Sequence, residues 1–144
     1  MHSVNSVPDA WLGVGLTASA FFALLTVAGA LQKSGAVSAE LSRKLVHIGL
    51  GLLAAGFPLL FEARWPVWLL AGSSIVALVA ARWVPAIRAR LGRALHGVER
   101  TSLGEIHFPL AVAIVWSAWP GDWLRYTVPI LILAIADATA ALAG

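Results

Sequence analysis

Five apolar runs separated by short polar loops constrain the fold of this chain more than any other feature. Hydrophobic residues make up 60% of the 144 residues, whereas soluble domains hold roughly 45–50%. A helix that crosses a bilayer needs roughly 20 residues, so the three middle runs must recruit flanking polar residues. We therefore predict an all-α fold, a polytopic membrane bundle of about five transmembrane helices in a single domain over residues 1–144. The five runs are residues 10–31, 45–61, 65–81, 106–119 and 126–144.

The loops between these runs differ in charge, which predicts the orientation of the bundle. Most Lys and Arg residues lie in the loops at 32–44 and 82–105, whereas the other two loops hold one each, Arg64 and Arg125. Basic loops stay on the cytoplasmic side of a membrane. We therefore predict a protein of the inner (cytoplasmic) membrane with its N-terminus outside. Six tryptophans then fall at the outer ends of the spans, where indole rings serve as interfacial anchors: Trp11, Trp65, Trp68, Trp116, Trp119 and Trp123.

Part of the second basic loop has the pattern of an amphipathic helix. Over residues 85–98 an apolar stripe, which includes Ile87 and Leu91, lies opposite basic residues such as Arg90. Such a helix lies along the headgroups of a membrane. It either serves as a basic connector or delivers the residues that follow it to a site.

Asp137 is the one charged residue in the last apolar run, 126–144. A carboxylate at membrane depth costs roughly 2.5–3.5 kcal/mol on insertion scales, so such residues usually face a polar cavity, an ion or a partner. The predicted topology places Asp137 in the cytoplasmic half of its helix. The other unusual polar residues fall on the same side: Arg43, Lys44 and His47 at the start of the second run, and Glu99, Arg100, Ser102, Gly104, Glu105 and His107 before the fourth.

The chemistry of these residues suits a phosphate or metal site. Carboxylates in a chain without cysteine suit a hard cation such as Mg²⁺. Arg and Lys suit phosphate oxygens, and Glu or His could orient a hydroxyl nucleophile. Each group also has a simpler interpretation: Arg43 and Lys44 as topology anchors, His47 as a packed histidine, and Glu105 as a helix cap. From the residues alone we predict an anionic or metal site on the cytoplasmic side.

Three segments in this order resemble the polyprenol kinase group: RKLVHIGLGLL (43–53), ERTSLGEIHFPLAVAIVW (99–116) and PILILAIADATAALAG (129–144). That group includes phytol kinase and dolichol kinase, and is related to phosphatidate cytidylyltransferase (CDP-diacylglycerol synthase). The resemblance implies a membrane enzyme that uses CTP and Mg²⁺ and acts on a lipid alcohol or a lipid phosphate. Members of the group continue past the Asp motif with a glycine- and basic-rich loop. We therefore expect this chain to be the N-terminal part of such an enzyme, and inactive alone.

The resemblance also suggests roles for the polar residues. It implies that Asp137 is a metal–nucleotide residue, and that Arg43, Lys44 and His47 lie near phosphate or the lipid headgroup. We predict in addition that Glu105 holds the metal ion with Asp137, and that His47 joins these two in catalysis. We also predict that nucleotide phosphates are bound by Arg43, Lys44, Arg100 and Ser102.

The function that we predict is CTP-dependent phosphorylation of an isoprenoid alcohol at the cytoplasmic face. An alternative is transfer of CMP to a lipid phosphate, as in phosphatidate cytidylyltransferase. A second alternative is a non-catalytic bundle or transporter fragment with an ion site at Asp137.

Overall fold

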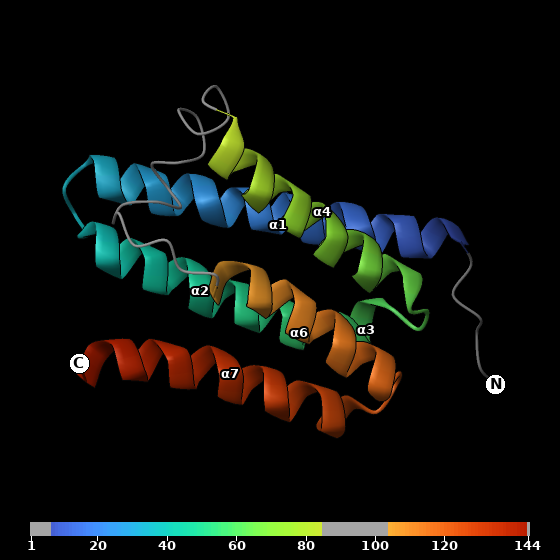
Figure 1. Ribbon diagram of the computed structural model, residues 1–144. Helices are drawn as coiled ribbons and strands as arrows, with labels where there is room; N and C mark the ends of the chain where they lie inside the picture. Colours follow the sequence, from blue (N-terminus) through green and yellow to red (C-terminus); the bar gives the residue numbers. More distant parts are fainter. Residues whose placement is uncertain (1–6, 85–103, 144) are drawn as a thin grey trace.

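The helices begin and end close to the polar loops of the sequence. The computed structural model describes residues 7–84 and 104–143, and at some positions near the ends of these ranges, Glu105 and Asp137 among them, the backbone alone. These residues form helices and no strand, so the predicted all-α fold is confirmed for them. The amphipathic helix predicted at 85–98 lies outside the described residues. The helices are α1 (Val7–Lys33), α2 (Ala39–Ala55), α3 (Phe57–Leu60), α4 (Trp65–Trp83), α6 (Gly104–Ala118) and α7 (Trp123–Ala143) (Figure 1).

The predicted bundle of five membrane spans is not confirmed. Of the helices that the structure describes, α1 alone is long and apolar enough to cross a membrane, over Asp9–Lys33. Apolar stretches in α4, α6 and α7 are shorter. α2 has 17 residues and α6 has 15, which correspond to about 26 and 23 Å, against a hydrocarbon core of about 30 Å. The first half of α2 is also charged, with Glu40, Arg43 and Lys44.

The order of the helices gathers chain segments at two opposite ends of the bundle. In Figure 1, α4 and α6 lie in front of α1 and α2, and α7 lies beside α2. The helices α1, α4 and α7 run toward one end, whereas α2 and α6 begin there (Figure 1). We call this end, which holds Arg43, Lys44 and His107, the basic end. The other, which holds Trp65 and Trp116, is the aromatic end.

α2 is the central helix, packed against α1 on one side and against α7 on the other. It begins at Ser38, whose hydroxyl caps the helix by accepting the Leu41 N–H. On the α1 side, the buried Ser42 donates its hydroxyl to the Ala28 carbonyl at 3.2 Å. On the α7 side, Gly51 lies so close to Ala134 that a side chain on Gly51 would collide with it. A glycine at this position lets the two helices approach closely.

The aromatic end contains most of the buried core. Trp116 is 0% exposed, donates its indole N–H to the Ala63 carbonyl at 3.1 Å, and packs edge-on against Tyr126 at 5.0 Å between ring centroids. Tyr126 donates its hydroxyl to the Ala54 carbonyl at 2.8 Å. The prediction that six tryptophans anchor the protein at an interface is therefore wrong for Trp116, which joins helices inside the bundle. Other members of the set, such as Trp123, are exposed.

Candidate functional site

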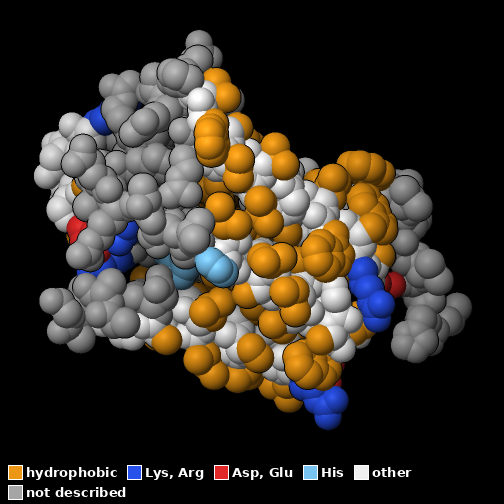
Figure 2. Space-filling model, viewed as in Figure 1, with side chains coloured by type: hydrophobic (Ala, Val, Ile, Leu, Met, Phe, Trp, Pro, Cys, Tyr) orange, Lys and Arg blue, Asp and Glu red, His pale blue; other side chains and the backbone are white. Residues whose placement is uncertain are grey.

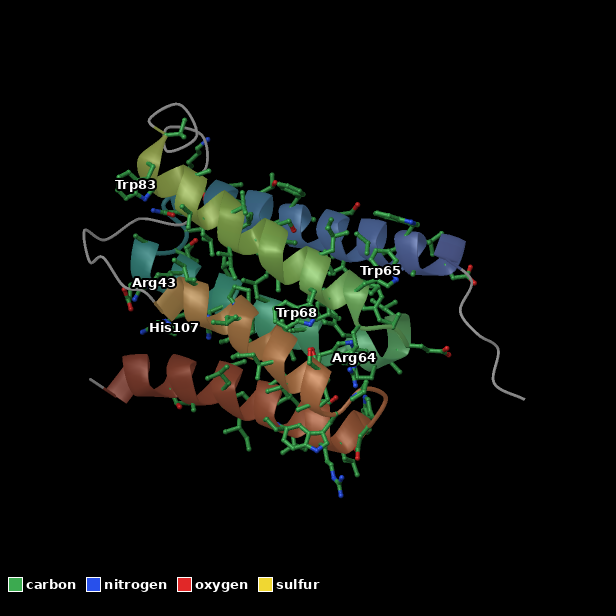
Figure 3. All side chains as sticks on the ribbon, turned by 45° about the vertical axis from the view of Figure 1, so that its right-hand side comes forward. Arg43, Arg64, Trp65, Trp68, Trp83 and His107 are labelled. Atoms are coloured by element: carbon green, nitrogen blue, oxygen red, sulfur yellow. The ribbon has the colours of Figure 1, made fainter. Side chains whose placement is uncertain are left out.

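The basic end brings together residues that the sequence analysis singled out. Figure 3 shows Arg43 and His107 at this end of the bundle, and Arg64 and Trp65 at the other. Arg43 and Lys44 come from the first turns of α2, and His107 comes from the first turn of α6. This convergence follows from topology, because helices that alternate in direction return alternate loops to the same end.

Arg43 and Lys44 share one carboxylate, that of Glu40. The Arg43 guanidinium lies 3.5 Å from Glu40 Oε1, and the Lys44 ammonium lies 3.7 Å from the same atom. These are contacts at i, i+3 and i, i+4 within one helix. Because Glu40 and Arg43 are each more than a third exposed, water screens this pair and it is weak. The Lys44 side chain is 13% exposed, so its contact with Glu40 is screened less. The sequence analysis did not single out Glu40, although its spacing from the two cations could have identified it as a site residue.

His47 connects the basic end to the helix interior. Its ring lies 4.9 Å from the Phe108 ring of α6, between centroids, in an edge-on arrangement. It follows Arg43 by one helical turn, so both side chains lie on the same face of α2. Packing against Phe108 agrees with the simpler interpretation of His47 as a packed histidine. Both His47 and Arg43 also line the groove described below.

The pairing of α2 with α7 fixes the level of Asp137. Tyr126 reaches Ala54, and Gly51 lies against Ala134, so the two helices are antiparallel. Asp137 follows Ala134 by three residues, and His47 precedes Gly51 by four. About one helical turn beyond the contact of Gly51 with Ala134, toward the basic end, the backbones of Asp137 and His47 are therefore level. The Asp137 side chain lies outside the description. The α7 backbone at Asp137 nevertheless lies at the height of His47.

The remaining predicted site residues lie before and within the start of α6. Glu105 is the second residue of α6, three before Phe108, so its backbone lies at the basic end and its side chain is outside the description. Arg100 and Ser102 lie outside the described residues altogether, as does Glu99.

The donor chemistry at this end fits Mg²⁺, although the structure does not define a metal site. Among the side chains that are described, no three of His, Asp and Glu come together as metal ligands would. Besides Glu40, which contacts Arg43 and Lys44, the carboxylate residues Asp137 and Glu105 have their backbones at this end, and carboxylate oxygens are the ligands that Mg²⁺ prefers. That Asp137 and Glu105 hold the ion stays a prediction.

A groove between α1, α2, α4 and α6 extends from this site. Its volume is about 450 Å³, and Arg43 and His47 are among its lining residues. The remaining lining is almost entirely apolar, with Phe21, Leu50 and Leu70 as examples. The sequence analysis missed this groove, because it depends on how four helices are rotated relative to each other.

Comparison with known proteins identifies one informative relative. No protein-family model matches the chain, and no solved structure matches it significantly. The chain is 30% identical over 139 residues to a phytol kinase from Synechocystis sp., a match that covers 93% of this chain and 56% of that protein. The chain therefore spans about half the length of this curated relative. The resemblance predicted from the three motifs is confirmed, and the chain is related to the phytol/polyprenol kinase-like family.

Proposed function

We propose that the protein phosphorylates an isoprenoid alcohol at the basic end of the bundle, with CTP as the phosphoryl donor. The observation that carries this proposal is the register of α2 and α7, which brings the backbone of Asp137 level with His47, one turn from Arg43. A relative named phytol kinase supports the reaction class. Transfer of a phosphoryl group needs positive charge around its oxygens and in-line positioning of the nucleophile. The basic end offers residues for both requirements.

In this proposal each residue of the basic end has a separate role in the reaction. Arg43 and Lys44 bind phosphate oxygens of the nucleotide and reduce their negative charge. His47 accepts the proton of the alcohol hydroxyl as its oxygen attacks the γ-phosphorus. The bond between that phosphorus and the bridging oxygen breaks, and CDP leaves with the electron pair. When Mg²⁺ is bound, it neutralises charge on the nucleotide phosphates and on the transferred group.

Phosphoryl transfer is favoured over the alternatives. The relative's name describes a kinase, and the comparisons offer no support for transfer of CMP to a lipid phosphate.

The protein in this proposal is embedded in a membrane, with its basic end at the cytoplasm. Figure 2 shows an apolar surface across the middle of the molecule, with Lys and Arg side chains toward its two ends on the face in view. Large apolar side chains such as Phe22, Leu59 and Val76 are more than half exposed. Exposed apolar surface of this extent fits contact with lipid. The excess of basic charge then directs the basic end inward.

This orientation can be tested with two matched cysteines, because the chain has none of its own. Ala36, between α1 and α2, and Ala63, between α3 and α4, are both exposed and lie at opposite ends. In intact cells an impermeant thiol reagent should label Ala63→Cys and spare Ala36→Cys, and permeabilised cells should label both. The reverse pattern would place the basic end outside, away from cytosolic nucleotide, and would refute the proposed site.

The reaction itself is tested with CTP labelled at either the α- or the γ-phosphate. Membranes that contain the protein as its cell produces it are incubated with Mg²⁺, the labelled nucleotide and a long-chain isoprenoid alcohol. Label from the γ-position should appear in the lipid fraction and label from the α-position should not. Transfer of the α-label to a lipid phosphate would identify a cytidylyltransferase, and transfer of neither would exclude the kinase reaction.

A further inference from the structure

The groove between α1, α2, α4 and α6 has the size of a ligand site. Its volume of about 450 Å³ lies within the range of about 300–1,000 Å³ that small-molecule sites occupy. Its walls extend from Val67 to Leu78 along α4, a length of about 16 Å at the rise of an α-helix. The groove is therefore elongated along the helices, and its shape suits a chain better than a compact molecule.

The hydroxyl groups that line the groove are already satisfied. Ser73 and Ser74 each donate to the Leu70 carbonyl, at 3.0 and 2.7 Å. Thr17 donates to the Gly13 carbonyl at 2.9 Å. Because each hydroxyl bonds back to its own helix, the walls require no polar partner from a ligand. The body of the groove is therefore suited to hydrocarbon.

Polarity is confined to the part of the groove that α2 contributes at the basic end. Among the described residues that line the groove, Arg43 is the one with a formal charge, and His47 lies one turn further along the same face. A long apolar wall with one cation at its end complements a molecule with one hydrocarbon chain and one hydroxyl or phosphate group. A lipid with two chains would need a second apolar path.

We propose that this groove binds the hydrocarbon chain of the substrate alcohol, with the hydroxyl placed at Arg43 and His47. This assignment rests on the proposed function and adds to it the location of the chain. It also explains how product is held, because Arg43 then meets the phosphate that the reaction attaches to the alcohol. The groove becomes the part of the site that selects long single-chain alcohols.

The test is photo-crosslinking with a twenty-carbon isoprenoid alcohol that carries a diazirine near its apolar end, without nucleotide. Because no phosphoryl transfer is needed, a negative result here is separate from failure of the kinase reaction. Crosslinks should map to the parts of α1 and α4 that line the groove toward the aromatic end, around Thr17 and Val67. Unlabelled long-chain alcohol should compete, whereas a two-chain phospholipid and a five-carbon alcohol should not.

A matched pair of substitutions on α1 provides the control. Ala18 lines the groove, whereas Ala23 on the same helix is exposed and does not line it. Ala18→Trp should lower crosslinking about tenfold or more, because the indole takes the space of several buried methylenes, and Ala23→Trp should leave it unchanged. A second blocking variant, Ala77→Phe on α4, should act like Ala18→Trp if the first fails to fold. Equal crosslinking in all folded variants, competition by phospholipid, or labelling of the outer face of α1 would overturn the proposal.

Discussion

The two ends of the bundle use their polar groups in different ways. At the aromatic end, Tyr126 and Thr127 of α7 donate hydroxyls to carbonyls of α2, and the Trp116 indole of α6 donates to the segment before α4. These bonds join helices that are far apart in sequence. At the basic end, Arg43 and Lys44 contact Glu40 within the same helix. The aromatic end therefore contains most of the hydrogen bonds that position the helices, whereas at the basic end the Arg43 side chain stays 40% exposed, where a ligand can reach it.

Because of this difference, the site combines a fixed register of the helices with charged side chains that can change their contacts. The bonds from Tyr126 to Ala54 and from Thr127 to Ala55 fix the register of α7 on α2 at one end. The close approach of Gly51 to Ala134 keeps the helices together toward the other. The level of Asp137 relative to His47 follows from these contacts, although none of them is at the basic end. Positioning by a rigid, distant element is how catalytic groups are usually held in place.

The largest effect should come from Asp137→Asn, assayed in the protein as its cell produces it. If the carboxylate holds Mg²⁺ against the nucleotide, turnover should fall about 10²-fold or more, the range seen when one electrostatic contact to a transition state is removed. Insertion and expression should remain normal, because losing a charge at membrane depth does not hinder insertion. The measurement is γ-label transfer from CTP, normalised to the amount of protein in the membrane.

Asp122→Asn at the aromatic end is the matched control. Asp122 accepts the Arg125 N–H at 3.1 Å at the start of α7, and asparagine caps a helix about as well as aspartate does. Turnover should therefore stay within about twofold of the wild type. Normal turnover in Asp137→Asn, or equal loss in both variants, would contradict the division between the two ends.

The second effect is on stability, and it should come from the aromatic end. Trp116→Ala removes a fully buried ring and its hydrogen bond to Ala63, which should lower the free energy of unfolding by about 3–5 kcal/mol. Unfolding in mixed detergent micelles measures this change. Trp119→Ala, at a residue that is 42% exposed, should cost about 0.5 kcal/mol or less. Similar losses in the two variants would mean that Trp116 does not join the helices as the structure indicates.

The contrast between the ends also separates what sequence could predict from what it could not. Helix positions followed from the apolar runs, and the meeting of Arg43, Lys44 and the start of α6 followed from the alternation of loops. The opposite roles of Trp116 and Trp123 did not follow, because both lie near the same end and only the rotation of each helix decides which ring is buried. The groove depends on rotation in the same way. The register of α7 on α2 also could not be predicted from the sequence, because it depends on close contacts such as that of Gly51 with Ala134.

The predicted number of membrane spans stays unconfirmed for a related reason. Apolar runs were counted as spans, but several described helices are shorter than the bilayer core. Short, partly charged helices such as α2 contain the predicted site residues Arg43, Lys44 and His47. The shortness and charge of these helices leave the span prediction unconfirmed, and they also place polar side chains at the basic end.

The smallest effect should come from Glu40→Gln. Whether this change tightens or weakens the binding of CTP distinguishes two roles for the basic end. Glu40 holds Arg43 and Lys44 at 3.5 and 3.7 Å, so a phosphate that binds these cations must compete with it. Exposed ion pairs are worth about 0.2–1 kcal/mol, so removing the competitor should tighten binding of metal-free CTP by up to about fivefold. Equilibrium binding of labelled CTP with and without Mg²⁺ measures this change.

Glu62→Gln, in the exposed segment between α3 and α4 at the aromatic end, changes the net charge by the same amount far from the cations. It should leave nucleotide binding unchanged, which separates local competition from the general effect of one negative charge fewer. If Glu40→Gln instead weakens binding only when Mg²⁺ is present, Glu40 contributes to the metal site and the ion pairs are secondary. If metal-free binding does not change in either variant, Arg43 and Lys44 are anchors of topology, and the phosphate must be bound elsewhere. The proposed role of Arg43 and Lys44 in binding the nucleotide requires that metal-free CTP bind more tightly to Glu40→Gln. It also requires that the affinity of Glu62→Gln for metal-free CTP stay unchanged.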